Sequence, residues 1–179
     1  MKLPTDRTVF QNAWVVPDLT AAMKKWTDEM KVGPFFVAEH GPNLTEVTYR
    51  GAPGELSMNV ALAQAGGVQI ELIEPTTDKP CAYRDTVAQG RSGFHHMCVW
   101  THDIDADAEY FAKLGYEAAN LGTANGSRFG YFDTTPLMNC MLEVLEYNPG
   151  AEAMFQKIAD AAQDWDGTDP VRDFSSLLA

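Results

Sequence analysis

Two glutamates, one glutamine and one histidine occupy matching places in two similar stretches of the chain. Each stretch ends in a run of the form apolar-Glu-apolar-apolar-Glu, and these runs carry Glu71 and Glu143. Near the start of the stretches, Gln11 and His96 each precede an Asp-apolar pair by the same spacing. The chain therefore contains an internal repeat, and we expect these four side chains to occupy equivalent positions in its two halves.

The two glutamates would need a partner if they were buried. Residues two apart on a strand share one face, so Glu71 points with Gln69 and Ile73. A carboxylate among apolar neighbours on a central strand is costly to bury without compensation. A bound divalent cation would offset this cost for Glu71 and Glu143 together.

The donor types indicate which ion this would be. One imidazole nitrogen, one amide oxygen and two carboxylates suit Zn, Co, Ni, Mn or Fe(II), with positions left open for water or substrate. We therefore predict one divalent metal ion, held by Gln11, Glu71, His96 and Glu143. His95 is expected to face the opposite side of the sheet, because it adjoins His96 on a strand. His102 precedes a helix start and is expected to be exposed.

Each half of the repeat reads as a strand, a helix and then three strands. In the first half, 9–16 is an apolar strand, and Asp18 is expected to cap a helix with one apolar stripe. In the second half, 94–100 is the strand, and Asp103 caps a helix that Gly115 ends. Further strands are predicted at 35–39, 45–50 and 56–63, with a fourth run at 68–74, and in the second half at 116–121, 128–133 and 138–146.

The predicted fold class is α+β, with two paired βαβββ modules and a C-terminal helix. One such module exposes an apolar sheet face and is marginal alone, so two should share a curved, mostly antiparallel sheet around a cleft. Trp165 and the tail around it are expected to pack back on the domain or on a partner subunit. We place the first module at 8–75, a linker at 76–92, the second module at 93–149, and the C-terminal helix and tail at 150–179.

Composition excludes several classes of partner. The chain has 179 residues, of which 45% are hydrophobic, and its formal net charge of −12 opposes binding to nucleic acid or anionic membranes. Three cysteines without Cys-x-x-Cys spacing argue against a disulfide framework and fit a reducing compartment. The N-terminus shows no apolar signal region, and no apolar run is long enough to cross a membrane. We therefore expect a cytoplasmic protein with a small-molecule substrate.

These motifs resemble the vicinal oxygen chelate superfamily (glyoxalase, bleomycin resistance protein and dioxygenase) over about residues 8–149. The resemblance rests on Gln11 and on the runs Ile70-Glu71-Leu72, Phe94-His95-His96 and Leu142-Glu143-Val144. The double histidine is most similar to the methylmalonyl-CoA epimerase-like branch. That branch usually has histidine where this chain has Gln11, and eukaryotic-type lactoylglutathione lyases have glutamine there. The resemblance implies the metal ligands Gln11, Glu71, His96 and Glu143, and it favours a homodimer.

The resemblance also implies an activity. The metal would act as a Lewis acid on a substrate carbonyl oxygen and stabilise an enolate. Glu143 would remove the proton beside the carbonyl, and Glu71 would return a proton to the other face or to a neighbouring carbon. We therefore expect a metal-dependent isomerase or epimerase, with a lyase as second choice, acting on a small or medium carbonyl compound. The candidate pocket residues are Tyr49, Arg50, Met58, Asn59, Phe129 and Tyr131.

Other activities of the superfamily fit less well. An extradiol dioxygenase needs two histidines and a carboxylate on Fe(II), and only His96 fits. A glutathione-dependent lyase needs cations for the glutathione carboxylates, but Val15 and Ser92 stand where its usual arginines would be. The 13 Lys and Arg also leave few cations for a CoA phosphate, so the choice between a CoA thioester and a free acid or ketone stays open. The alternative from another class is a non-catalytic, resistance-type protein that binds a small hydrophobic compound in the same cleft.

Overall fold

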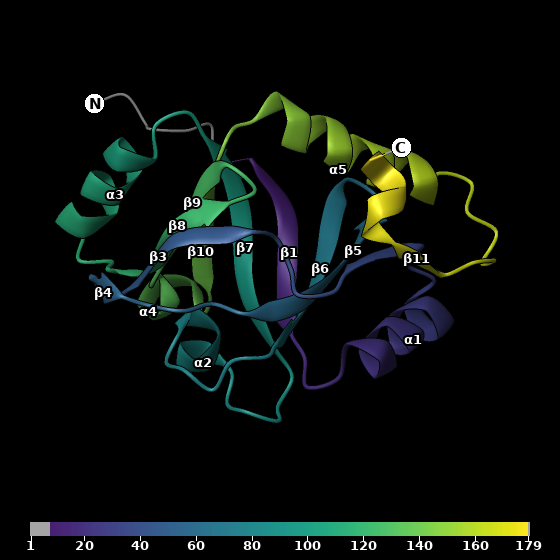
Figure 1. The fold of residues 1–179 in the computed structure, drawn as a ribbon, viewed down its shortest axis with the longest axis horizontal. Coiled ribbons are helices and arrows are strands. Elements are labelled where there is room, and N and C mark those ends of the chain that lie inside the picture. Colours follow the sequence, from purple (N-terminus) through teal and green to yellow (C-terminus); the bar gives the residue numbers. More distant parts are fainter. Residues whose placement is uncertain (1–7, 179) are drawn as a thin grey trace.

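The computed structural model of the protein describes residues 8–178 (Figure 1). A strand, a helix and further strands occur twice, and a C-terminal segment follows. The elements in chain order are β1 (Val9–Val15), α1 (Leu19–Met30), β2 (Phe35–Ala38), β3 (Leu44–Tyr49), β4 (Ala52–Pro53), β5 (Met58–Ala65), β6 (Val68–Pro75), α2 (Ala82–Thr86), β7 (Gly93–Thr101), α3 (Ile104–Lys113), β8 (Ala118–Ala124), β9 (Ser127–Phe132), α4 (Thr135–Met138), β10 (Met141–Glu146), α5 (Pro149–Ala162), β11 (Val171–Asp173) and the 3-10 helix η1 (Phe174–Leu178).

The strands of the described residues form one 11-stranded sheet in the order β11-β2-β5-β6-β1-β7-β10-β9-β8-β3-β4. Its centre is the antiparallel pair of β1 and β7, which are the first strands of the two halves. The last strand of each half, β6 or β10, lies parallel beside the first strand of that half. The predicted α+β fold, with two paired modules and a curved sheet, is confirmed.

One strand of the first half pairs with a strand of the second half. Strand β3 pairs antiparallel with β8 of the second half, with Leu44 opposite Ala124 and Tyr49 opposite Asn120. Strand β2, which precedes it, stays beside β5 near the other end of the sheet. The chain between β2 and β3 therefore crosses the molecule, and in Figure 1 the blue β3 segment passes in front of β10 and β7. The internal repeat predicted the strand but gave no sign of this crossing.

Helices α1 and α3 cover the outer face of the sheet, one for each half. Leu19 and Met23 of α1 pack in one cluster with Ile70 and Leu72 of β6. Phe111 of α3 packs in another with residues of β7, β9 and β10. Because Ile70 and Leu72 face the outer side, strand alternation turns the residue between them to the concave side. That residue is the first of the two repeated glutamates.

Both helices begin at the predicted caps. An oxygen of Asp18 accepts a hydrogen bond from the backbone nitrogen of Ala21 at 2.8 Å, and an oxygen of Asp103 accepts one from Ala106 at 2.9 Å. Each cap satisfies a backbone donor that the first turn leaves without a helical partner.

The segment 76–92, expected to be a linker, contains helix α2. Cys81, Ala82, Tyr83 and Val87 are all buried in the cluster on the concave side of the sheet. The backbone nitrogen of Ala82 donates to the side-chain oxygen of Asn120 at 2.7 Å. The segment therefore supplies side chains to the concave face as well as joining the two modules.

The C-terminal segment returns to the first module. Strand β11 pairs parallel with β2, so β2 is no longer at the edge of the sheet. The ring of Trp165 lies against Gly33, where atoms of the ring come within 2.7 Å of the place that a Cβ would take. Ile158 of α5 and Leu177 of η1 are buried in the concave cluster. The tail thus packs on the domain itself, which was one of the two expected arrangements.

No helix among residues 8–178 combines the length and the apolar character that a membrane span requires.

Candidate metal centre

Three of the four predicted ligands meet on the concave face of the sheet. Glu71 comes from β6, His96 from β7 and Glu143 from β10, and one potential ligand atom of each lies within 4.8 Å of the others. Ala13 of β1 is the register partner of both Glu71 and His96. Its small side chain leaves room for the carboxylate and the imidazole to approach one another across β1.

The imidazole nitrogen at the centre of this cluster has the geometry of a ligand. His96 Nε2 lies 2.9 Å from an oxygen of Glu143 and 3.4 Å from an oxygen of Glu71. It is buried, and among the described residues neither contact has the geometry of a hydrogen bond. An orphaned ring nitrogen between two carboxylates fits a divalent cation, because such an ion would use all three donors at once.

The charges of the cluster depend on each other. Burial opposes the charge on His96, but Glu143 and Glu71 outweigh burial and raise the pKa of His96 to about 9. Burial also raises the pKa of Glu71, against the contact with His96, which lowers it. Two buried carboxylates that share one imidazole form a negative centre, and a cation bound there would neutralise it.

Gln11, the fourth predicted ligand, lies on the same face of β1 as Ala13 and lines the same cavity as the glutamates. Its amide nitrogen donates to the side-chain oxygen of Gln69 at 2.7 Å. This bond orients the amide so that its oxygen, the atom that binds metals, is not used by Gln69. The role of Gln11 as a ligand stays a prediction.

His95 lies on the concave side, so the prediction that it faces away from His96 was wrong. Ala13 pairs with His96 while Trp14 pairs with Phe94, which leaves His95 as an extra residue in a β-bulge. Its ring centroid is 5.1 Å from that of His96 and 5.3 Å from that of Tyr131. The prediction assumed a regular strand, and the bulge cancels the alternation of faces at this point.

Two tyrosines complete the surroundings of the histidines. The hydroxyl groups of Tyr83 and Tyr131 lie 3.2 Å apart, and the ring of Tyr131 also lies 5.1 Å from that of His96. Burial raises the pKa of each tyrosine well above its usual value, and the nearby glutamates add to this effect. Both therefore remain neutral hydroxyl groups that can donate hydrogen bonds. His102 is exposed, as expected.

The cluster lies at the floor of a cavity of about 620 Å³. Gln11, Glu71 and Glu143 line its polar part, and the side chains of Met58, Phe129 and Tyr131 belong to its walls. The chain between β2 and β3 contributes to the cavity, and so do α5 and η1. Of the candidate pocket residues, the structure thus brings Met58, Phe129 and Tyr131 to the site.

Tyr49 and Asn59 are not brought to the cavity. Asn59 lies between Met58 and Val60, which line it, so strand alternation turns Asn59 to the other face, where it donates to Glu74 at 2.9 Å. Tyr49 lies at the end of β3, and its hydroxyl donates to Asp85 at 2.8 Å. The expectation that these two residues line the pocket is corrected accordingly.

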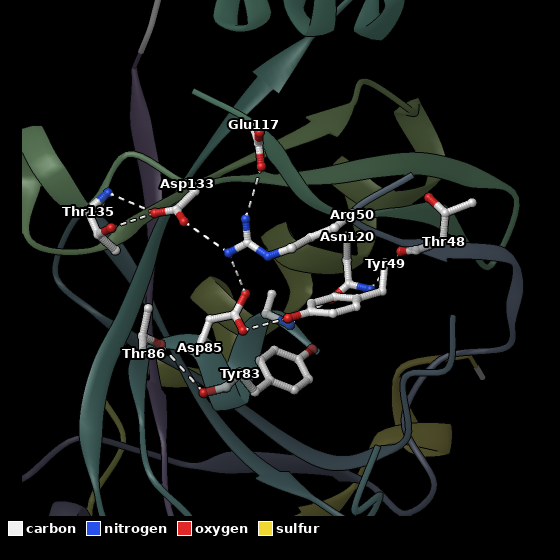
Figure 2. Close-up of polar contacts among 11 residues, drawn as sticks. Thr48, Tyr49, Arg50, Tyr83, Asp85, Thr86, Glu117, Asn120, Asp133 and Thr135 are labelled. Carbon is white, nitrogen blue, oxygen red and sulfur yellow. Dashed lines mark hydrogen bonds and ion pairs between the residues drawn. The ribbon is translucent and has the colours of Figure 1, made fainter. Parts of the chain in front are cut away.

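Tyr49 instead belongs to an ionic network around Arg50, which was also a candidate pocket residue and does not line the cavity either (Figure 2). The Arg50 guanidinium donates to Asp85 at 2.9 Å, to Asp133 at 3.1 Å and to Glu117 at 3.2 Å. These acids come from α2, from the end of β9 and from the approach to β8. The network therefore fastens the crossing strand β3 to the second module and to α2.

Sequence reasoning did not identify His95, Tyr83, or the residues of α5 and η1 that line the cavity as parts of the site. The Phe-His-His run was visible, but nothing in a single strand pattern announces a bulge. Tyr83 lies in the polar segment 76–92, which was expected to be a linker. The apolar stripe of the C-terminal helix was visible, but its place over the cavity depends on packing between distant parts of the chain.

Comparison with known proteins gives a family and a fold. A protein-family profile described as "Glyoxalase/Bleomycin resistance protein/Dioxygenase superfamily" matches residues 10–131. The crystal structure of methylmalonyl-CoA epimerase from Mycobacterium tuberculosis is similar, with 15% identity, a TM-score of 0.52, and coverage of 81% of this chain and 91% of that chain. A hypothetical protein from Bacillus halodurans C-125 has 16% identity, a TM-score of 0.54, and coverage of 80% of this chain and 96% of that chain. A search of the curated proteins found no match.

Proposed function

Because the chain belongs to the glyoxalase/bleomycin resistance protein/dioxygenase superfamily, we propose that it is a metal-dependent isomerase or epimerase. The proposed reaction moves a proton on the carbon next to a carbonyl group. One observation carries the proposal: Glu71 and Glu143 approach the same nitrogen of His96, at 3.4 and 2.9 Å, at the floor of a cavity large enough for a small molecule.

Glu71, His96 and Glu143 would hold a divalent cation, with the amide oxygen of Gln11 as the fourth ligand. When bound, the ion supplies Lewis-acid chemistry toward a carbonyl oxygen. The buried rings of Tyr83 and Tyr131 and the apolar walls lower the polarity around the floor, which strengthens electrostatic interactions there.

The two glutamates would carry the proton. Glu143 takes the proton from the carbon next to the carbonyl, and Glu71, from the other side of His96, delivers one. Their strands, β6 and β10, lie on opposite sides of the central pair of strands. Two carboxylates that reach one carbon from opposite sides can invert its configuration, whereas one carboxylate acting alone shifts a proton between neighbouring atoms. The pair in this site therefore favours epimerisation.

The donor set disfavours a dioxygenase. Among the described residues, the cluster holds one histidine and two glutamates, whereas non-haem Fe(II) oxygenases use two histidines and one carboxylate. His95 does not belong to the cluster of ligand atoms, and its Nδ1 lies 2.8 Å from the Nδ1 of His96.

Metal analysis and isotope exchange test the proposal. Purified protein should contain about one divalent ion per chain, and His96→Ala should lose it. In deuterium oxide, the metal-loaded protein should exchange the proton next to the carbonyl in a panel of neutral 2-hydroxy ketones. Glu143→Gln should retain most of the metal and lose the exchange. A native protein without metal, whose added metals bind only weakly, would support the non-catalytic binding protein instead.

A further inference from the structure

From the composition of the cavity walls, we propose that the substrate is an uncharged carbonyl compound with a bulky apolar body. The C-terminal segment, α5 with η1, would select it by covering that body. This inference rests on the proposed function only for the carbonyl end of the substrate, which the metal centre would bind. The selection of an apolar body rests on the walls of the cavity.

The charged side chains of the cavity lining lie together, and most of the rest of the lining is apolar. Its floor carries Gln11, Glu71 and Glu143, while β5 contributes Met58, Val60 and Leu62 to the walls. Burying an apolar body against such walls is favourable, because it removes apolar surface from water. A ligand that places its carbonyl at the floor therefore places most of its remaining atoms against hydrocarbon and aromatic surface.

The C-terminal segment forms the apolar cover. Met154 and Phe155 of α5, together with Phe174 and Leu178 of η1, line the cavity. Phe155 is held by ring contacts to Phe10 and to Trp100, with centroid distances of 5.9 and 5.8 Å. A hydrogen bond of 2.6 Å from Lys157 Nζ to the carbonyl oxygen of Leu177 joins α5 to η1. The cover is thus a packed structure, and it lies beyond residue 131, where the family match ends.

Charge distinguishes this pocket from one built for an anionic substrate. Among the described residues that line it, none is lysine or arginine, and the only charged side chains are Glu71 and Glu143 at the floor. Phosphate and carboxylate groups are ordinarily recognised by arginine or lysine. A CoA thioester or a glutathione conjugate would bring several anionic groups into walls that offer them no cationic partner. The lining therefore selects against both.

The size of the cavity fits an apolar compound with one or two rings. Its volume of about 620 Å³ lies within the range of about 300–1,000 Å³ found for pockets that hold drug-sized ligands. Ser127, Asn125 and Asn148 offer neutral hydrogen-bonding groups on the lining. An additional hydroxyl or keto group on the substrate could therefore be accommodated, whereas an ionised group could not.

Binding to a matched set of probes tests the inference. The metal-loaded Glu143→Gln protein, which should not turn over, is titrated by calorimetry with benzoin, acetoin, a ring-carboxylated benzoin and methylmalonyl-CoA. Benzoin and acetoin share the neutral 2-hydroxy ketone and differ in apolar body, and the carboxylated benzoin adds one charge. We expect benzoin to bind at least tenfold more tightly than each of the other three. Any result in which it does not do so overturns the inference.

A substitution in the cover tests the role of the C-terminal segment. Met154→Lys should move the affinity ratio of carboxylated benzoin to benzoin at least tenfold in favour of the carboxylated probe. Gln156→Lys adds the same positive charge at an exposed site on the same helix and should leave the ratio unchanged. If Met154→Lys does not fold, Met154→Gln replaces it and should weaken benzoin binding severalfold without a gain for the charged probe. Equal ratios in the wild type and the Met154 variant would show that α5 does not select the substrate.

The same probe separates this inference from the proposed function. Wild-type protein is given one enantiomer of benzoin, and racemisation is followed on a chiral column. In that reaction the bond between hydrogen and the carbinol carbon breaks, the proton passes to Glu143, and a proton returns to either face, so that no oxidant is needed. Tight binding of benzoin without racemisation or exchange would contradict the proposed function and leave the apolar selection standing. Racemisation of methylmalonyl-CoA with weak benzoin binding would support the proposed function and contradict the apolar selection.

Discussion

The Nδ1 atoms of His95 and His96 lie 2.8 Å apart, and both rings are completely buried. Burial, with the adjacent His96, holds the pKa of His95 well below its usual value, so His95 is neutral. Its Nδ1 can then accept a hydrogen bond from the Nδ1–H of His96. Metal-binding histidines commonly donate their second ring N–H to such a partner, which fixes the ring orientation and leaves the other nitrogen free for the metal. We therefore predict that His95 positions His96 for metal binding.

Two substitutions of His95 separate this positioning from packing. His95→Leu fills the space but removes the acceptor, and it should weaken metal binding by about 10- to 100-fold. His95→Asn keeps an acceptor oxygen near the place of Nδ1 and should stay within a few fold of the wild type. Titration of the metal-free proteins with zinc, monitored by calorimetry, gives the affinities. If both variants lose affinity equally, the contribution of His95 is packing alone.

The sequence predicted that Glu71, His96 and Glu143 lie together, because their positions depend on strand alternation and on the repeat. The faces of Glu71 and Glu143 follow from period-two patterning on β6 and β10 and from the repeat of the two runs. The face of His95 could not be predicted, because a bulge adds one residue to a strand without changing its composition. The face of the sheet on which a side chain lies can be predicted from sequence only where the strand is regular.

The sequence did not predict that β3 crosses to the second half or that α5 and η1 cover the cavity, and the reason is different. A strand pattern at 45–50 shows that a strand forms, but the partner strand is chosen by contacts far apart in the chain. Here Arg50, at the end of β3, finds its acidic partners in α2 and the second module. Because β3 pairs with β8, Tyr49 contacts Asp85 and does not line the pocket as expected. Local patterns predicted the elements, and long-range packing decided which of them border the cavity.

Gln11 provides a direct test of the fourth ligand. If its amide oxygen binds the ion, Gln11→Ala should weaken zinc binding by at least tenfold and leave a three-residue site of Glu71, His96 and Glu143. Asn12→Ala, on the opposite face of the same strand, is the control and should leave the affinity unchanged. Zinc affinities from competition with a chelator would decide the matter, and equal affinities for Gln11→Ala and the wild type would remove Gln11 from the ligand set.

The ionic network should stabilise the position of β3. Arg50→Met keeps the aliphatic length of the side chain and removes its contacts to Asp85, Asp133 and Glu117. Exposed ion pairs contribute about 0.2–1 kcal/mol each, so we expect a loss of about 1–2 kcal/mol in the free energy of unfolding. Urea denaturation, monitored by tryptophan fluorescence, measures it.

Arg128→Met is the matched control for the network. Arg128 pairs with Asp105 at 2.6 Å, and both side chains are exposed, with 47% and 77% of their surface accessible. One exposed pair should cost less than 1 kcal/mol. An Arg50 variant no less stable than the Arg128 variant would show that the network adds nothing beyond a single surface contact.

The stabilisation by Arg50 should also disappear in acid. Burial raises the pKa of Asp133, but the hydrogen bonds from Thr135 and the contact with Arg50 outweigh it, so the folded-state pKa lies below its usual value. A carboxyl group with a depressed pKa stabilises the folded protein above its unfolded pKa of about 3.9, and this stabilisation is lost as the pH falls through the folded value. The difference in unfolding free energy between the wild type and Arg50→Met should therefore be largest near pH 7 and shrink below about pH 4. Urea titrations at several pH values between about 7 and 3 measure this difference. A difference that is the same at pH 7 and pH 3 would mean that the ion pairs of Arg50 do not account for it, because only the ionic part depends on the charge of the carboxylates.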